Sequence, residues 1–99
     1  MRQLLVRPIA RAEIEAAFDW YLERSAAVAS QFLDAIDGGL TRITEMPEAQ
    51  AIIRGRLRRV LLHRFPYAIY YKVYPSRISV VGVIHGHRHP ATWLSRSAL

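Results

Sequence analysis

The fold of this chain is decided by residues 67–85, which read YAIYYKVYPSRISVVGVIH. Residues 67–74 are rich in the aromatic and β-branched side chains that prefer strands. Residues 78–85 are apolar almost throughout, which predicts a central strand buried on both faces. Between them, Tyr74-Pro75-Ser76-Arg77 has the composition of a turn. The stretch therefore predicts two neighbouring strands at the centre of a sheet.

Two further strands are predicted outside this pair. Residues 56–64 alternate around Val60 and Leu62 and indicate a strand. Pro66 cannot donate a ladder hydrogen bond, so it marks a turn or the start of the next strand. Residues 2–7 indicate a short strand, which we expect at an edge of the sheet.

Two helices are predicted between the first strand and Pro47. The first covers residues 9–24, and its apolar stripe consists of Ile14, Ala17, Phe18, Tyr21 and Leu22. Its wet side carries Glu13, Glu15, Asp19 and Glu23. The second covers residues 26–45, with Ser25 as its cap and a stripe of Ala29, Phe32, Ile36, Leu40 and Ile43. The two stripes face each other and predict a helical hairpin.

Two details complete the expected fold. Gly38-Gly39 lies inside the second helix, where we expect close packing against the first helix or a kink. A short helix is expected to begin at His89-Pro90. The element order is therefore β-α-α-β-β-β-α over a single domain of residues 1–99. It predicts an α+β fold, with an N-terminal strand, a helical hairpin packed on a small antiparallel sheet, and a short C-terminal helix.

Charge is distributed unevenly along the chain. Residues 1–48 hold five arginines and eight carboxylates, a net charge of −3, whereas residues 49–99 hold eight arginines and one lysine without a carboxylate, a net charge of +9. The second half lacks its own ion-pair partners. Its charges must face solvent, the acidic half or an anionic partner. Thirteen of the 14 basic residues are arginine, whose guanidinium binds carboxylate and phosphate in bidentate geometry.

Composition excludes several classes of protein. The chain has no cysteine, which rules out disulfides and cysteine zinc sites and is typical of a cytoplasmic protein. No segment approaches the roughly 20 apolar residues of a membrane span. The N-terminal apolar run is too short for a signal peptide. A chain of 99 residues holds one core but not also a deep enclosed cavity, so we expect a surface site or a groove.

A set of segments in a fixed order covers almost the whole chain. The segments are Asp19-Trp20-Tyr21, Pro47, the Gly55 loop leading into RRVLL at 58–62, RFPYAIYY at 64–71, and VIHGHRHPATW at 83–93. In this order they resemble the RelE/ParE superfamily, the toxins of type II toxin–antitoxin systems. The segment around Phe65-Pro66-Tyr67 and the ending with His85, Arg88, Pro90 and Trp93 are more similar to the ParE branch.

The resemblance implies a cognate antitoxin that binds and neutralises the protein, together with one of two targets. In the ParE branch the protein is a non-enzymatic inhibitor of DNA gyrase, which we favour. The alternative is a RelE-like endoribonuclease that cleaves mRNA on the ribosome. RelE-type nucleases usually carry a C-terminal tyrosine or histidine beside basic residues, and here no tyrosine follows Tyr74. A third hypothesis is a degenerate module that binds only its antitoxin and DNA.

Several residues are candidates for contact with the target or the antitoxin. They are Trp20, Arg54, Arg56, Arg58, Arg64, Tyr70, His87, Trp93 and Arg96. The arginines can clamp phosphates or an acidic antitoxin segment, although a solvated strand is the plainer interpretation. Tyr70 is expected to be the better exposed tyrosine. Trp20 is either a partly exposed anchor or a residue at the edge of the core, and Trp93 is expected to pack back on the sheet.

The nuclease alternative needs a base for the 2′-hydroxyl, a cation for the phosphorane and an acid for the leaving oxygen. Arg59, His63, His85 and Arg88 are the candidates for these roles. On a continuing strand, His85, His87 and His89 would project about 7 Å apart, too far for all three to ligate one metal ion. We therefore expect neither a metal site nor a cofactor.

Overall fold

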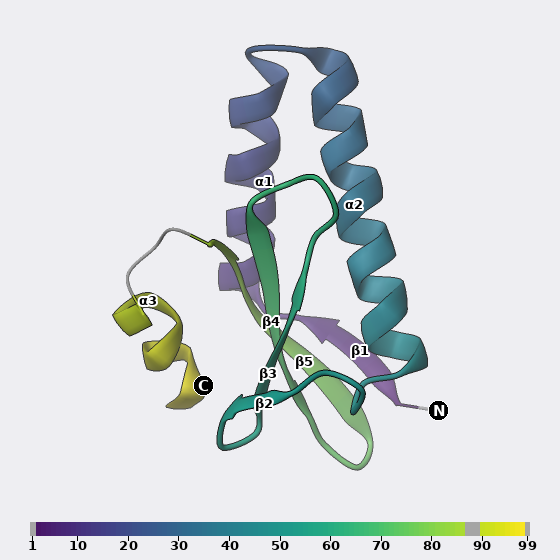
Figure 1. Ribbon diagram of the computed structural model, residues 1–99, viewed down its shortest axis with the longest axis vertical. Coiled ribbons are helices and arrows are strands. Elements are labelled where there is room, and N and C mark those ends of the chain that lie inside the picture. Colours follow the sequence, from purple (N-terminus) through teal and green to yellow (C-terminus); the bar gives the residue numbers. More distant parts are fainter. Residues whose placement is uncertain (1, 87–89, 99) are drawn as a thin grey trace.

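The computed structural model describes residues 2–86 and 90–98. Five strands form one mixed sheet in the order β1-β5-β4-β3-β2 (Figure 1). The strands are β1 (Gln3–Val6), β2 (Ile52–Arg54), β3 (Leu57–Leu61), β4 (Tyr67–Val73) and β5 (Arg77–His85). Helices α1 (Pro8–Leu22) and α2 (Ala26–Glu45) form a hairpin on one face, and α3 (Pro90–Leu94) with the 3-10 turn η1 (Ser95–Ala98) lies beside the sheet.

The predicted α+β class is confirmed, with two differences in the sheet. The sheet is mixed rather than antiparallel, because β1 runs parallel to β5 and pairs Leu4 with Ile78 and Val6 with Val80. β1 lies at an edge, as predicted. At the other edge, the three-residue strand β2 was not predicted, and it pairs Ile52 with Arg58 of β3. A strand of three residues is too short to show the alternation of apolar and polar residues that identifies longer strands.

The helical hairpin forms for the reasons expected from its sequence. Pro8 occupies the first turn of α1, where its missing N–H costs no hydrogen bond. The Ser25 hydroxyl accepts a hydrogen bond from the Val28 N–H at 3.2 Å and caps α2, whose bounds match the prediction. The first helix ends two residues earlier than predicted. Leu22, expected in the apolar stripe, is 46% exposed because it lies at this end of the helix.

The core lies on both faces of the sheet, as predicted for β5. In β4, Ile69 and Tyr71 pack toward the helical hairpin, whereas Ala68 and Tyr70 belong to a second cluster. A bulge in β5 shifts this alternation, because Tyr70 pairs with Gly82 and Tyr71 with Val80. The residue between them, Val81, is extra and faces the second cluster.

Gly39 is explained by the sheet, not by the first helix as we expected. A Cβ atom at Gly39 would lie 2.7 Å from Cδ1 of Ile69 in β4 and 3.1 Å from Cδ2 of Leu62, which follows β3. A side chain at this position would require the Ile69 side chain or α2 to shift. Gly38, by contrast, faces open space. Among the described residues, no helix combines the length and the apolar character needed to cross a membrane.

Candidate functional site

A groove of about 530 Å³ runs between α1 and the far end of β5. It forms because β1 ends at Val6, opposite Val80, while β5 continues to His85. Beyond this point no strand of the described chain covers that edge of β5. The lining residues are Glu13, Ala16, Ala17, Trp20, Tyr21, Pro66, Tyr67, Val83, Ile84 and His85. The lining is mostly apolar, as in sites that take a side chain from a partner.

Aromatic rings connect this groove to the centre of the core. The ring of buried Phe32 lies 5.3 Å from Tyr21 and 5.6 Å from Tyr67, measured between centroids. Tyr67 in turn contacts the ring of His85 edge to face at 5.2 Å. Burial raises the pKa of Tyr21, and the neighbouring Tyr67 raises it further. The groove wall is therefore held rigidly by the hydrophobic core.

Trp20 lies at the exposed end of this aromatic series and is 50% exposed. Its ring meets Tyr21 edge to face at 5.0 Å. The Arg24 guanidinium lies 3.5 Å from the Trp20 ring centroid and also donates to the Trp20 carbonyl at 2.7 Å. Trp20 thus has a fixed orientation while half of its surface faces solvent. A ring held in this way would lose little rotamer entropy on contact with another molecule.

The exposed backbone of β5 is satisfied by two charged side chains. Glu13 Oε1 accepts from the Val83 N–H at 3.0 Å, and Arg96 Nη1 donates to the Val81 carbonyl at 2.8 Å. The two side chains also form a bidentate ion pair, with N–O distances of 3.1 and 3.0 Å. Gly82 makes room for it, since a Cβ there would lie 2.7 Å from Arg96 Nη1. Arg96, a candidate binding residue, therefore ties the C-terminal turn to α1.

The arginines between residues 54 and 64 do not form one cluster. Arg58 pairs with Tyr71 and donates to the carbonyls of Glu48 and Gln50 on the hairpin side of the sheet. Arg59 pairs with Tyr70 on the opposite face and donates to its hydroxyl. The remaining three, Arg54, Arg56 and Arg64, have exposed side chains. Arg64 adopts a φ of 68°, so it belongs to a tight turn before β4.

Tyr70 is not exposed, which corrects our expectation. Only 3% of its surface is accessible, because the Trp93 ring stacks on it with a centroid distance of 6.1 Å. Trp93 packs back on the sheet as predicted. Lys72 follows the same face and is 6% exposed, and its amine donates to the Ser97 carbonyl. The C-terminal segment thus covers this part of the sheet.

Of the four candidates for RNA cleavage, Arg59, His63 and His85 lie in the described part of the chain and are spread over the fold. His63 is exposed in the loop after β3. His85 pairs with Tyr67 and therefore faces the hairpin side, whereas Arg59 faces the opposite side with Tyr70. The structure does not bring Arg59 and His85 together. Arg88 and the other two histidines of the run, His87 and His89, lie outside the described residues.

Within residues 2–86 and 90–98, no three histidine, aspartate or glutamate side chains come close enough to hold a metal ion. Sequence reasoning missed Glu13, which it placed on the wet side of the first helix, and the pairing of Glu13 with Arg96. The two residues are 83 positions apart, so no local pattern indicates their contact. The absence of carboxylates from residues 49–99 did indicate that the arginines of this half need partners elsewhere.

Comparison with known proteins identifies the family. Residues 4–90 match the family model described as the ParE toxin of the type II toxin–antitoxin system parDE. Among solved structures, the chain resembles one titled chromosomal ParDE TA system from P. aeruginosa, with a TM-score of 0.65 and 16% identity. The match covers 86% of this chain and 96% of the other, and at this identity it shows the fold alone. No curated protein matches in sequence. The chain belongs to the ParE toxin family.

Proposed function

We propose that this ParE-family toxin inhibits DNA gyrase by binding it, and that a cognate antitoxin neutralises it. The protein would act in the cytoplasm, without catalysing a reaction. Family membership supports gyrase as the target, because the ParE branch acts on this enzyme. The molecule also has a preformed surface that is suited to binding a partner.

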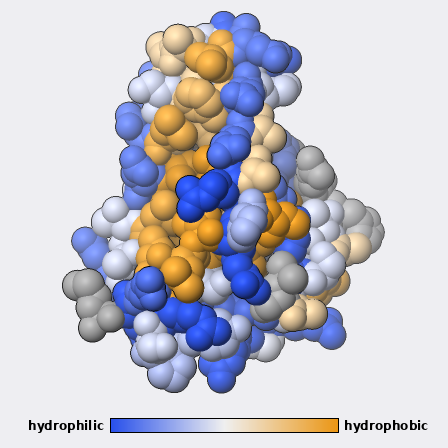
Figure 2. All heavy atoms as spheres, turned by 180° about the vertical axis from the view of Figure 1, so that it is seen from behind, coloured by the Kyte–Doolittle hydropathy of each residue, from blue (hydrophilic) through white to orange (hydrophobic). Residues whose placement is uncertain are grey.

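The observation that supports binding of the antitoxin is the groove with half-exposed Trp20 at its margin. A binding partner gains most when a rigid aromatic ring and a preformed apolar hollow are already in place. The hairpin offers more apolar surface nearby. Ile9, Leu22 and Leu33 are each about 40% exposed or more, and Figure 2 shows an apolar stripe along the hairpin seen from behind. We assign these surfaces to the antitoxin.

The nuclease alternative has weaker support. Cleavage requires the cation and the general acid or base to reach one phosphate at the same time. Arg59 and His85 project from opposite faces of the sheet. Binding to gyrase makes no such demand on their geometry.

The direct experiment titrates purified toxin into a gyrase supercoiling reaction, with and without the co-encoded antitoxin. Inhibition that the antitoxin relieves is the expected result. No effect at a large molar excess of folded protein would refute gyrase as the target. Cleavage of ribosome-bound mRNA by wild-type protein, lost in Arg59→Ala, His63→Ala or His85→Ala, would then establish the nuclease.

The role of Trp20 can be tested with a matched pair of variants. Trp20→Ala removes the anchor, and Leu61→Ala removes an exposed apolar side chain of β3, 59% against 50%, that neither lines the groove nor belongs to the hairpin. We expect Trp20→Ala to weaken antitoxin binding by roughly 30-fold or more, the effect of a binding hot spot of about 2 kcal/mol. Leu61→Ala should change the Kd by less than about fivefold. Equal effects, measured by calorimetry, would contradict an anchor at Trp20.

A further inference from the structure

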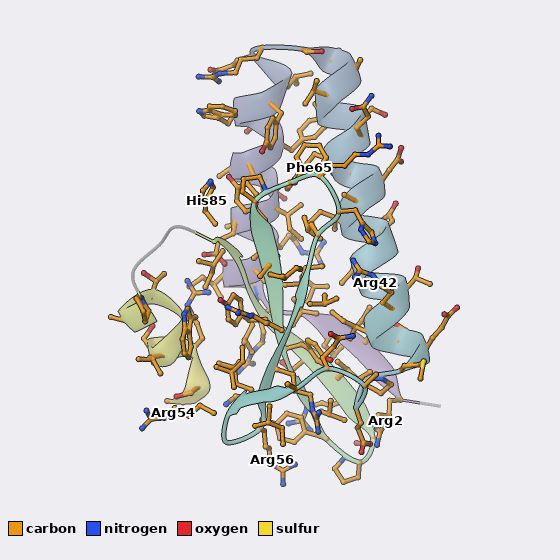
Figure 3. All side chains as sticks on the ribbon, viewed as in Figure 1. Arg2, Arg42, Arg54, Arg56, Phe65 and His85 are labelled. Atoms are coloured by element: carbon orange, nitrogen blue, oxygen red, sulfur yellow. The ribbon has the colours of Figure 1, made fainter. Side chains whose placement is uncertain are left out.

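A group of arginines meets at the end of the sheet that lies away from the tip of the helical hairpin. The turn between β2 and β3 and the turn between β4 and β5 both lie there, and Arg2 precedes β1 at the same end. Figure 3 shows Arg2 and Arg56 at this end. We define the basic end as Arg2, Arg56, Arg58 and Arg77 around Tyr74. Three of these arginines, with Tyr74, line a hollow of about 420 Å³.

Tyr74 organises the basic end. The Arg77 Cζ atom lies 4.2 Å from the Tyr74 ring centroid, and the Arg56 Cζ atom lies 5.1 Å from the same centroid. Arg56 also donates to the Val73 carbonyl at 3.2 Å, and Arg2 Nε donates to the Tyr74 carbonyl at 2.9 Å. Stacking and carbonyl contacts hold the guanidinium groups in place without neutralising their charge.

The positive charge of this end is not balanced. Of the described residues that line the hollow, Glu48 alone is acidic. It forms an ion pair with Arg2 at 3.0 Å, and its side chain is 62% exposed. Three guanidinium groups therefore share the hollow with one carboxylate. Each guanidinium carries five N–H donors, so donors remain beyond the one or two bonds that each of Arg2, Arg56 and Arg58 makes here.

We propose that the basic end binds the phosphates of duplex DNA. Preorganised arginines with spare donors suit phosphate oxygens, and binding to a phosphate backbone needs no apolar anchor. A protein partner needs such an anchor at the centre of its interface. On this molecule the exposed tryptophan, Trp20, belongs to the groove between α1 and β5, whereas the large apolar side chain exposed at the hollow of the basic end is Ile52, which is smaller than a tryptophan ring. This DNA contact goes beyond the proposed function, because it belongs to the isolated toxin and requires neither gyrase nor antitoxin.

The test measures binding of purified toxin to a short fluorescent DNA duplex by anisotropy over a range of salt concentrations. The logarithm of the affinity should fall linearly with the logarithm of salt, with a slope of about −0.9 for each phosphate contacted. The double variant Arg56→Gln, Arg77→Gln should weaken binding and make the slope shallower by roughly two. The control variant Arg7→Gln, Arg11→Gln removes the same charge from exposed positions outside the basic end and should leave the slope unchanged.

Three results would overturn the proposal. The first is no binding of wild-type protein to the duplex at low salt. The second is an equal change of slope in the control variant, which would reveal a general effect of net charge. The third is binding of a fluorescent oligoglutamate peptide that is lost in the Arg56→Gln, Arg77→Gln variant while duplex binding is unchanged in it, which would assign the end to an acidic protein segment. If thermal melts show that the double variant is unfolded, Arg77→Gln alone should change the slope by about one.

Discussion

Replacing Glu13 by glutamine tests whether the ion pair with Arg96 holds the C-terminal segment on the sheet. The Arg96 side chain is 11% exposed and that of Glu13 is 26% exposed. Breaking a fully buried pair costs about 3–5 kcal/mol, and a fully exposed pair contributes at most about 1 kcal/mol. This pair lies between those limits. Glutamine keeps an oxygen that can accept from the Val83 N–H, so we expect a loss of about 2 kcal/mol.

A loss of this size is easily measured. In a domain of this length, about 2 kcal/mol lowers the melting temperature by roughly 8–16 °C. Hydrogen exchange should also accelerate at residues 90–98, which depend on Arg96, more than at α2. The double variant Glu13→Gln, Arg96→Gln should lose less than the sum of the two single variants. Gly82→Ala should have a similar effect, because its Cβ would lie 2.7 Å from Arg96 Nη1.

The reasoning would be refuted if Glu13→Gln lowered the melting temperature by less than about 4 °C, a loss of less than about 1 kcal/mol, as expected for an exposed pair. It would also fail if the effects of the two single variants added completely. Glu15→Gln on the same helix, where the side chain is exposed, is the matched control and should leave the melting temperature nearly unchanged.

Three further predictions concern the hairpin and two tyrosines of the core, Tyr21 and Tyr71. Gly39→Ala should destabilise the protein by about 1–3 kcal/mol because its Cβ would overlap the Ile69 side chain of β4. Gly38→Ala, which meets open space, should stabilise the protein by about 0.5–1 kcal/mol, and urea unfolding of both variants decides this. Ser25→Ala should cost about 1 kcal/mol in the same assay through loss of the cap of α2, and an unchanged midpoint would contradict that role. Burial raises the pKa of Tyr21 and of Tyr71, where Arg58 opposes the rise by a smaller amount. The stabilisation from neutral tyrosine is therefore complete below the unfolded pKa of about 10 and is lost as pH rises through the folded pKa, so constant stability between pH 9 and pH 11 would contradict it.

Local signals in the sequence predicted most of the fold because they act within a few residues. Ser25 and Pro47 bracket α2, and the apolar run of residues 78–85 gives a strand buried on both faces. The alternation in β4 also placed Tyr70 on the same face as Ala68. It could not show that the chain returns after α3 to cover that face with Trp93. For this reason Tyr70 was expected to be exposed.

The candidate site was less predictable because it is built from distant segments. Trp20 stood out as a tryptophan beside the main stripe of the first helix. The groove next to it depends on where β1 ends against β5, which is a matter of register between residues more than 70 positions apart. Arg2 and Arg77 were not grouped with the arginines of residues 54–64, because only the folded sheet brings both turns to one end.

The bulge at Val81 and Gly82 makes the length of β5 as important as its composition. The extra residue turns Val83 and His85 toward the groove while Val81 and Ile84 remain in the second cluster. Deleting one residue here would turn each later side chain of β5 to the opposite face of the sheet. The face that lines the groove and the face that holds Arg96 would then be exchanged. Natural variants of this toxin should therefore tolerate substitutions along the strand far better than a change of one residue in its length, and insertions should accumulate instead in the exposed turn at Gly55.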